Sequence, residues 1–318
     1  MHLDVPPRIL KSTALILGAG ASCDVNYPTN PELIANICLK FAKGNGHRDK
    51  AVNDRIMAEG PIDEFIHSLE MSQKESIDQF LQKRTEFEDI GRFAIASELI
   101  SVEDETLLMR NGRKSWYYGL RRFLGDSLGN HNIRIVTFNY DRSFEHYLFS
   151  AIKNSTGLPD VVVADEMSKL GIQHVHGQLS PLPWQFPEKS RPYSNKLSGK
   201  EIWKASRDIR LTHQNFASGD DHFSPAEVVE TSEQVYFFGF GFHDDNMKKL
   251  GLSPRSISGG KYFGASVTKM DPADLRALSA RYPRLHQFAT IDEALMDMIQ
   301  RGSEETPSAP KVRPKVIR

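Results

Sequence analysis

Thr13-Ala-Leu-Ile-Leu-Gly-Ala-Gly-Ala-Ser22 is the stretch that decides the fold class of this 318-residue chain. Its first five residues form an apolar run rich in strand formers, and the run closes on Gly18 and Gly20. An apolar run that ends on glycines is typical of a buried parallel strand entering a tight turn. The stretch therefore predicts the first strand of an α/β protein.

Further strand patterns follow, and helical patterns separate them along the chain. The clearest strand covers residues 133–138, and a helix is expected over residues 271–282. Strands that alternate with helices favour a mostly parallel sheet with helices on both faces. We therefore predict a Rossmann-like α/β fold. The remaining strands are expected at residues 161–164, 172–176, 235–238, 262–267 and 285–289.

The region between the first strand and residue 133 carries helical patterns only. Asn30 is expected to cap a helix that has Pro31 at its first position. Ser76 and Gln79 have the spacing of a capping box, and apolar residues at helical spacing follow them. A further amphipathic helix is expected over residues 115–128. These patterns predict a helical insert at about residues 45–130.

The domain boundaries follow from where these patterns begin and end. One domain is expected over residues 13–301, preceded by an N-terminal segment, 1–12. Residues 302–318 are rich in Pro, Ser and Lys, which predicts a disordered tail that can be removed without unfolding the core. The proline-containing stretch 180–224 is expected to be a loop.

Composition excludes several classes of function. The chain has 40 basic and 41 acidic residues, so no overall charge attracts nucleic acid or an anionic membrane. No apolar run approaches the roughly 20 residues of a spanning helix, and no secretory signal is visible, so we expect a cytoplasmic protein. The two cysteines, Cys23 and Cys38, cannot form a four-thiolate zinc site. No metal is therefore expected.

Glycine-rich or polar segments follow four of the predicted strands. In open parallel sheets, ligands bind outside the carboxyl ends of the strands, so the repetition predicts one shared pocket. The segments are Gly18-Ala-Gly-Ala-Ser22, Thr137-Phe-Asn-Tyr-Asp141, His174-Val-His-Gly177 and Phe238-Gly-Phe-Gly-Phe-His-Asp-Asp-Asn246.

Each of these segments also has a structural interpretation. The first lacks the last glycine of G-x-G-x-x-G, where Cys23 stands, and could be a plain tight turn. Asp141 could cap the following helix, since Asn and Asp favour turns and caps. His174 and His176 could be structural, and as zinc ligands they lack a third partner nearby.

Taken together and in this order, the four segments resemble the sirtuin superfamily. Gly18-Ala-Gly-Ala-Ser22 resembles its glycine-rich opening, and Thr137-Phe-Asn-Tyr-Asp141 resembles its T-x-N-[IY]-D, whose Asn lies beside the nicotinamide ribose. His176-Gly177 resembles the catalytic His-Gly. Gly239-Phe-Gly241 corresponds to the late glycine loop on the adenine side. The likeness spans roughly residues 13–300.

Two departures from the deacylating sirtuins point to another branch. The four-cysteine zinc module is missing, and the late loop reads G-F-G rather than G-T-S. Ser76-Ile-Asp-Gln-Phe-Leu81 resembles a helical segment of the sirtuin-like proteins of bacterial anti-phage defence. The resemblance therefore implies the defence branch, whose members hydrolyse NAD.

This resemblance implies an NAD hydrolase that yields nicotinamide and ADP-ribose, with NAD as its substrate. Asn139 is expected to orient the ribose hydroxyls and water, and His176 to act as the base. Asp141 is expected to fix the loop that holds Asn139. The residues expected to contact NAD are Gly18, Ala19, Gly20, Ser22, Thr137, Asp141, Gly239 and Gly241.

Constant NAD hydrolysis would be toxic, so gating by self-assembly or by a partner defence protein is expected. Two alternatives remain open: an NAD-dependent protein deacylase, and a non-catalytic sensor of NAD or ADP-ribose. A dehydrogenase is less favoured because no acidic residue stands where one would bind the adenosine ribose.

Overall fold

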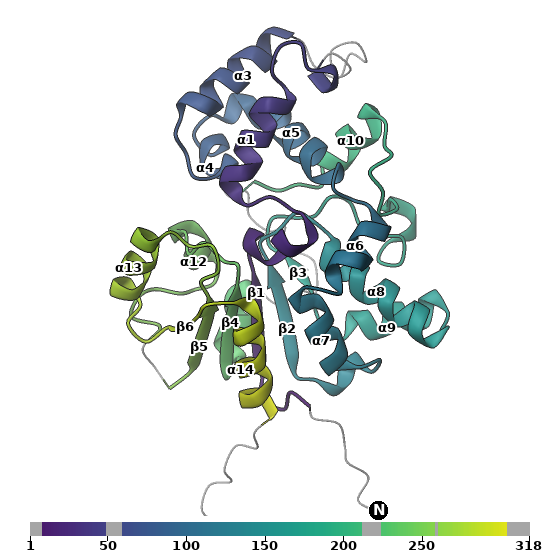
Figure 1. Ribbon diagram of the computed structural model, residues 1–318, viewed down its shortest axis with the longest axis vertical. Coiled ribbons are helices and arrows are strands. Elements are labelled where there is room, and N and C mark those ends of the chain that lie inside the picture. Colours follow the sequence, from purple (N-terminus) through teal and green to yellow (C-terminus); the bar gives the residue numbers. More distant parts are fainter. Residues whose placement is uncertain (1–7, 49–58, 212–223, 258–259, 304–318) are drawn as a thin grey trace, which may run out of the picture.

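The central strand of the protein is β1 (Thr13–Leu17), which is buried along its whole length. It pairs in parallel with β2 (Ile133–Thr137) on one side and β4 (Gln234–Phe238) on the other. The computed structural model describes residues 8–48, 59–211, 224–257 and 260–303. Within them the sheet has six parallel strands in the order β3-β2-β1-β4-β5-β6 (Figure 1). This is the Rossmann strand order, and the predicted fold class is confirmed.

Three further strands complete the sheet, and the two at its edges, β3 and β6, are shorter than the five-residue strands between them. The three are β3 (Gln173–His174), β5 (Tyr262–Ser266) and β6 (His286–Phe288). The predicted strands at 133–138, 235–238, 262–267 and 285–289 are therefore confirmed to within about a residue or two at each end. The strand predicted at 172–176 is reduced to two residues.

Helices occupy both faces of the sheet and the region beyond its carboxyl ends. Those before β2 are η1 (Ala19–Val25, a 3₁₀ helix, as are all elements labelled η), α1 (Asn30–Lys40), α3 (Glu59–Met71), α4 (Ile77–Leu81), η2 (Thr85–Phe87), α5 (Glu88–Ile100), α6 (Glu105–Gly112), α7 (Trp116–Leu124) and η3 (Leu128–Asn130). Those after β2 are α8 (Ser143–Thr156), α9 (Asp160–Ser168), η4 (Pro187–Lys189), α10 (Gly199–Ser206), α11 (Pro225–Thr231), α12 (Asp244–Lys249), α13 (Pro272–Arg281) and α14 (Ile291–Ser303).

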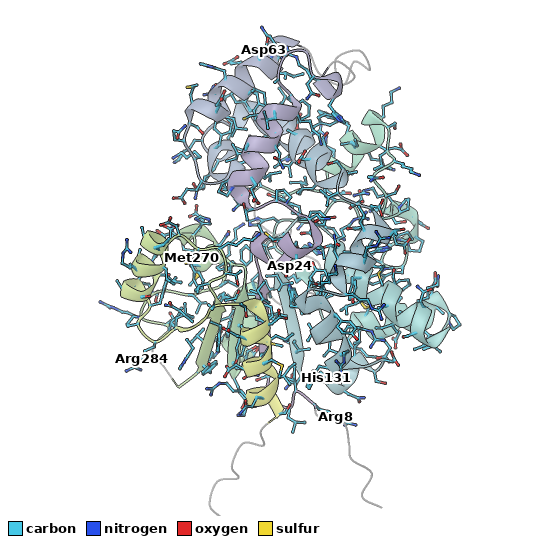
Figure 2. All side chains as sticks on the ribbon, viewed as in Figure 1. Arg8, Asp24, Asp63, His131, Met270 and Arg284 are labelled. Atoms are coloured by element: carbon cyan, nitrogen blue, oxygen red, sulfur yellow. The ribbon has the colours of Figure 1, made fainter. Side chains whose placement is uncertain are left out.

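The two faces of the sheet belong to two separate apolar clusters. Leu15 and Leu17 of β1 pack in the cluster that includes residues of α7, α8 and α14. Ala14 and Ile16, which point the other way, pack with residues of α11, α12 and α13. Side chains fill both layers between sheet and helices (Figure 2). Burial on both faces explains why β1 is apolar at nearly every position.

A helical lobe formed by α1, α3, α4 and α5 lies beyond the carboxyl ends of the strands (Figure 1). Between β1 and β2 the described residues form helices and no strand. α10 comes from much later in the chain and packs against α5, where the rings of Phe93 and Trp203 lie 5.9 Å apart. The lobe therefore covers the sheet edge at which ligands of Rossmann-like proteins bind.

The structure corrects several local predictions. Residues 161–164 are not a strand but part of α9, where Val163 is buried while Val161 is 75% exposed. A run of β-branched residues favours a strand locally, but only one of these side chains has a core to pack against. Residues 180–224 are not all loop, since they contain η4 and α10. Residues 212–223 of that stretch lie outside the described residues.

Helix ends differ from the sequence prediction at three places. The cap of α1 is Thr29 rather than Asn30, and Thr29 and Glu32 form a capping box there. The helix predicted over 115–128 ends at Leu124, where Gly125 follows with φ 65°. α14 continues to Ser303, two residues into the predicted tail. The rest of that tail, residues 304–318, lies outside the described residues.

Two glycine loops make backbone contact at the carboxyl ends of β1 and β4. The Gly20 amide donates to the carbonyl oxygen of Gly239 at 3.0 Å. A Cβ on Gly239 would lie 2.1 Å from the backbone nitrogen of Ala21, and one on Gly18 would lie 2.5 Å from the Gly239 oxygen. Gly239 also has φ +58°, a conformation that side chains disfavour. Neither loop can carry a larger residue at these positions.

We predict that Gly239→Ala destabilises the protein by about 3 kcal/mol or more, because backbone strain and overpacking add together. Gly157→Ala is the matched control, since Gly157 has φ +66° and a Cβ added there would meet no atom within 4 Å. It should cost only the strain, about 1–2 kcal/mol. Urea denaturation of both variants measures the difference, and equal losses would contradict the close contact.

Candidate functional site

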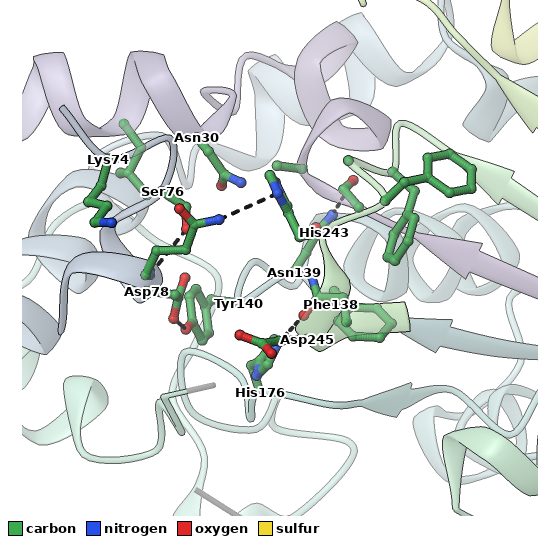
Figure 3. A pocket seen from close by; sticks show the side chains of 18 of the residues that line it. Asn30, Lys74, Ser76, Asp78, Phe138, Asn139, Tyr140, His176, His243 and Asp245 are labelled. Atoms are coloured by element: carbon green, nitrogen blue, oxygen red, sulfur yellow. Dashed lines mark hydrogen bonds between the residues drawn. The ribbon is translucent and has the colours of Figure 1, made fainter. Parts of the chain in front are cut away.

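A cavity of about 500 Å³ lies between the carboxyl ends of the strands and the helical lobe. Its walls come from the loops after β1, β2 and β4, from the segment after β3, and from the start of α1 and α4 (Figure 3). It lies where β1 separates β2 from β4, which is the topological switch point of this strand order. Pockets that hold small ligands and cofactors are typically about 300–1,000 Å³.

Six of the ten residues predicted for the site line this cavity, and four do not. The residues that line it are Gly18, Ala19, Asn139, Asp141, His176 and Gly241. The residues that do not are Gly20, Ser22, Thr137 and Gly239.

The two glycine loops form a wall of the cavity, but the glycine amides in them do not offer free hydrogen-bond donors to a ligand. Gly18 donates its amide to the Phe238 carbonyl at 3.0 Å, and Gly20 donates to Gly239. The Gly239 amide in turn donates to Ser266 Oγ at 3.0 Å. Since these amides are already paired, they are not available to a phosphate. The wall near the glycines is therefore a packed backbone surface with Gly18 and Ala19 facing the cavity.

Asn139 is held in place from three sides. Its Nδ2 donates to the Gly18 carbonyl at 3.0 Å and to Ser22 Oγ at 3.3 Å. Its backbone amide donates to Thr137 Oγ1 at 3.1 Å. Among the hydrogen bonds of the described residues, none uses the side-chain oxygen of Asn139. Ser22 and Thr137 thus support Asn139 from behind and leave one oriented acceptor for a ligand.

Asp141 lines the cavity, but both of its carboxylate oxygens accept hydrogen bonds from neighbouring residues of the protein. Its Oδ2 accepts from Ser22 Oγ at 3.0 Å, and its Oδ1 accepts from both the amide, at 3.0 Å, and the hydroxyl of Ser143, the first residue of α8. Burial raises the pKa of this carboxyl group, although the hydrogen bonds oppose that effect. The geometry matches a residue that fixes the loop. Asp141 also holds the start of α8 through the Ser143 amide, but the N-cap residue of α8 is Arg142 rather than Asp141.

His176 lies deep in the cavity wall, only 4% exposed. Its Nε2 lies 3.4 Å from Asn246 Oδ1, and its Nδ1 is buried with no hydrogen-bond partner among the described residues. The Phe138 ring packs edge-on against the imidazole at 5.4 Å. Burial lowers the pKa of His176 below its ordinary value, so the ring is neutral near pH 7. A neutral imidazole can accept a proton.

His174, two residues earlier, is a supporting residue. Its Nδ1 donates to the Asn139 carbonyl at 2.9 Å, and its Nε2 pairs with Glu145. Burial alone would lower the pKa of His174, but the charge and hydrogen bond of Glu145 outweigh burial and hold it above the ordinary value. Both ring nitrogens are therefore occupied. The described residues contain no group of three or more His, Cys, Asp or Glu placed to hold a metal.

The sequence did not assign several side chains that the fold brings to the cavity. The helical lobe contributes Asp78 and Gln79, and the late loop contributes His243 and Asn246. Gln79 Nε2 and His243 Nδ1 lie 3.5 Å apart and join the two walls. Both parent segments, 76–81 and 238–246, were recognisable as unusual. Nothing in their sequence indicates that they face each other.

Comparison of the chain with protein-family models gives no match, and comparison with curated proteins gives no match either. Among the described helices, none is long and apolar enough to cross a membrane. The function must therefore be argued from the cavity itself.

We predict that Glu145→Gln removes a pH-dependent part of the stability. Because the pKa of His174 is raised in the folded state, the pairing of protonated His174 with Glu145 stabilises the fold. This stabilisation is fully present below the pKa of an unfolded histidine, about 6.5. This stabilisation is lost as the pH rises through the folded-state pKa. The difference in melting temperature between wild type and variant should therefore be largest near pH 5.5 and shrink towards pH 9. A constant difference would show that the pair is not ionised as described.

Proposed function

We propose that the protein binds NAD in this cavity and hydrolyses the bond between nicotinamide and ribose. The observation that carries the proposal is the meeting of Asn139 and His176 in one cavity at the switch point of a Rossmann-ordered sheet. An oriented amide oxygen and a neutral imidazole are the groups that this hydrolysis needs. Lys74 and Lys83 also line the cavity and supply positive charge toward a pyrophosphate.

Asn139 acts on the ribose and the attacking water. Cleavage passes through an oxocarbenium-like state, as in glycoside hydrolysis, and the leaving nicotinamide needs no strong acid. The fixed Nδ2 of Asn139 aims its oxygen, which accepts a hydrogen bond from a ribose hydroxyl or from water. Its orientation is set before the substrate binds, and this preorganisation is what lowers the barrier.

His176 acts as the base, directly or through a ribose hydroxyl. As the bond between C1′ and the pyridinium nitrogen breaks, its electron pair neutralises the nicotinamide ring. The water oxygen bonds to C1′ and its proton passes to the neutral imidazole. The products are nicotinamide, ADP-ribose and one proton, so the reaction balances.

The resemblance to sirtuin-like defence proteins supplies the biological setting of this proposal. NAD hydrolysis would deplete the cytoplasm of an infected cell, and gating by self-assembly or by a partner protein would protect an uninfected one. The cavity geometry supports the chemistry only, while the setting rests on the resemblance.

Asn139→Ala and His176→Ala are each expected to reduce nicotinamide release by about a hundredfold, because each removes one positioned group from the transition state. Asn139→Ala also loses two hydrogen bonds, so its stability should fall by about 1–2 kcal/mol. Turnover is measured by nicotinamide release, and stability by melting temperature under the same conditions.

His286→Ala is the control for His176→Ala, because His286 is exposed at the far edge strand β6 and should leave turnover unchanged. If both cavity variants keep near-normal turnover, or lose it only because they unfold, the assignment of Asn139 and His176 is wrong.

The pH dependence of kcat/KM tests the state of His176. Since burial lowers its pKa, the imidazole stays neutral and active as the pH falls towards about 6.5. The rate should decline only below that pH, where the ring becomes protonated. A midpoint at or above about 6.5 would rule out His176 as a desolvated base.

A further inference from the structure

The cavity wall from the helical lobe carries an acidic side chain, Asp78, that the mechanism above does not use. Asp78 lies on α4, 61 positions before Asn139 in the chain, and lines the same cavity. Figure 3 shows Asp78, Tyr140 and His176 around one part of it. The lobe thus brings a carboxylate to a site built otherwise from the ends of strands.

The packing of α4 keeps Asp78 on the cavity side. Ile77, Phe80 and Leu81 are each at most 2% exposed and belong to the apolar core. Ser76 caps the helix by accepting from the Gln79 amide at 3.2 Å. Because three of the five residues of α4 are buried in the lobe, the helix cannot rotate without losing this packing.

Tyr140 connects Asp78 to the loop after β2 that carries Asn139. Its hydroxyl donates to Asp78 Oδ1, and its ring centroid lies 6.1 Å from that of His176. Tyr140 directly follows Asn139 and is itself 7% exposed, so its position is tied to the same loop. Burial raises the pKa of Tyr140 well above its ordinary value, and the charge of Asp78 adds to this effect, so the hydroxyl remains a donor.

The second carboxylate oxygen of Asp78, Oδ2, makes no hydrogen bond within the described part of the chain. Oδ1 is held by Tyr140, whereas Oδ2 takes part in no hydrogen bond or ion pair with another described residue. The negative charge of Asp78 acts on His176, where it opposes the lowering of the pKa by burial. A held carboxylate with one unused oxygen accepts hydrogen bonds from O–H or N–H groups of a ligand.

We propose that Asp78 is a further catalytic residue, a carboxylate of the helical lobe that binds the hydroxyls of the nicotinamide ribose. The inference rests on the proposed NAD hydrolysis. Phosphates of NAD offer only acceptors and would be repelled, whereas the ribose offers two neighbouring O–H donors. Because Asp78 is hydrogen-bonded to Tyr140, whose ring lies 6.1 Å from that of His176, it lies at the reacting end of the proposed substrate. Positive charge moves onto this ribose in the transition state, and a nearby carboxylate stabilises it.

The first test is Asp78→Asn, which keeps the shape and removes the charge. We expect kcat to fall by about a hundredfold with little change in KM or melting temperature, since the interaction strengthens in the transition state. Glu70→Gln is the matched control, because Glu70 is an exposed acid on α3 that does not line the cavity. It removes the same charge from the same lobe and should leave the rate unchanged.

The second test uses NAD analogues that lack the 2′- or the 3′-hydroxyl of the nicotinamide ribose. Their rates are divided by the rates of spontaneous hydrolysis, which corrects for intrinsic reactivity. If Asp78 binds a hydroxyl, removing that hydroxyl slows the wild type but slows Asp78→Asn little further. Such coupling with one analogue or both supports the inference, and a structural role for Asp78 would not produce it.

These tests distinguish a failure of the proposed NAD hydrolysis from a failure of the role proposed for Asp78. A wild-type protein that releases no nicotinamide from NAD overturns the proposed function, and the inference falls with it. An active wild type whose Asp78→Asn variant keeps its rate overturns the inference alone. So does a slow variant whose losses are additive with both analogues.

Discussion

The backbone contact between the loops after β1 and β4 is the constraint on which the rest of the site depends. Gly20 and Gly239 share a hydrogen bond at a separation that no side chain could tolerate. This contact packs the two loops together at the carboxyl ends of β1 and β4. The packed backbone there forms one wall of the cavity. The glycines that resemble a phosphate-binding motif are needed for this contact, whether or not a phosphate binds nearby.

The loop after β2 is built upon that wall. Asn139 reaches across from the end of β2 to the Gly18 carbonyl, and Ser22 joins Asn139 to Asp141. His174 then supports the loop from the neighbouring strand through the Asn139 carbonyl. A chain of hydrogen bonds thus fixes the side chain of Asn139 in the wall of the cavity that the buried, neutral His176 also lines. Preorganisation of this kind is the physical basis of the proposed catalysis.

The sequence was most informative where a residue's role depends on its own strand. Apolar runs ended by polar residues correctly located the central strands and brought Asn139 and His176 to one sheet edge. The valines at 161–164 misled the prediction because tertiary packing, which buries only Val163, overrode local propensity. Asp78 and Glu145 were not predictable, because each acts through a partner that only the folded chain brings near. Gly20 and Gly239 were recognised as glycines of a site, but their contact with each other was not.

In the proposed reaction, water acting in this cavity replaces nicotinamide on the ribose of NAD. The most direct measurement is to incubate the full chain with NAD in ¹⁸O-water, with and without an acyl-lysine peptide, and to identify the products by mass spectrometry. Hydrolysis by water should give equal amounts of nicotinamide and ADP-ribose, one ¹⁸O atom in the ADP-ribose, and no effect of the peptide. NAD that remains intact, or nicotinamide released only together with an acylated ADP-ribose, would contradict it.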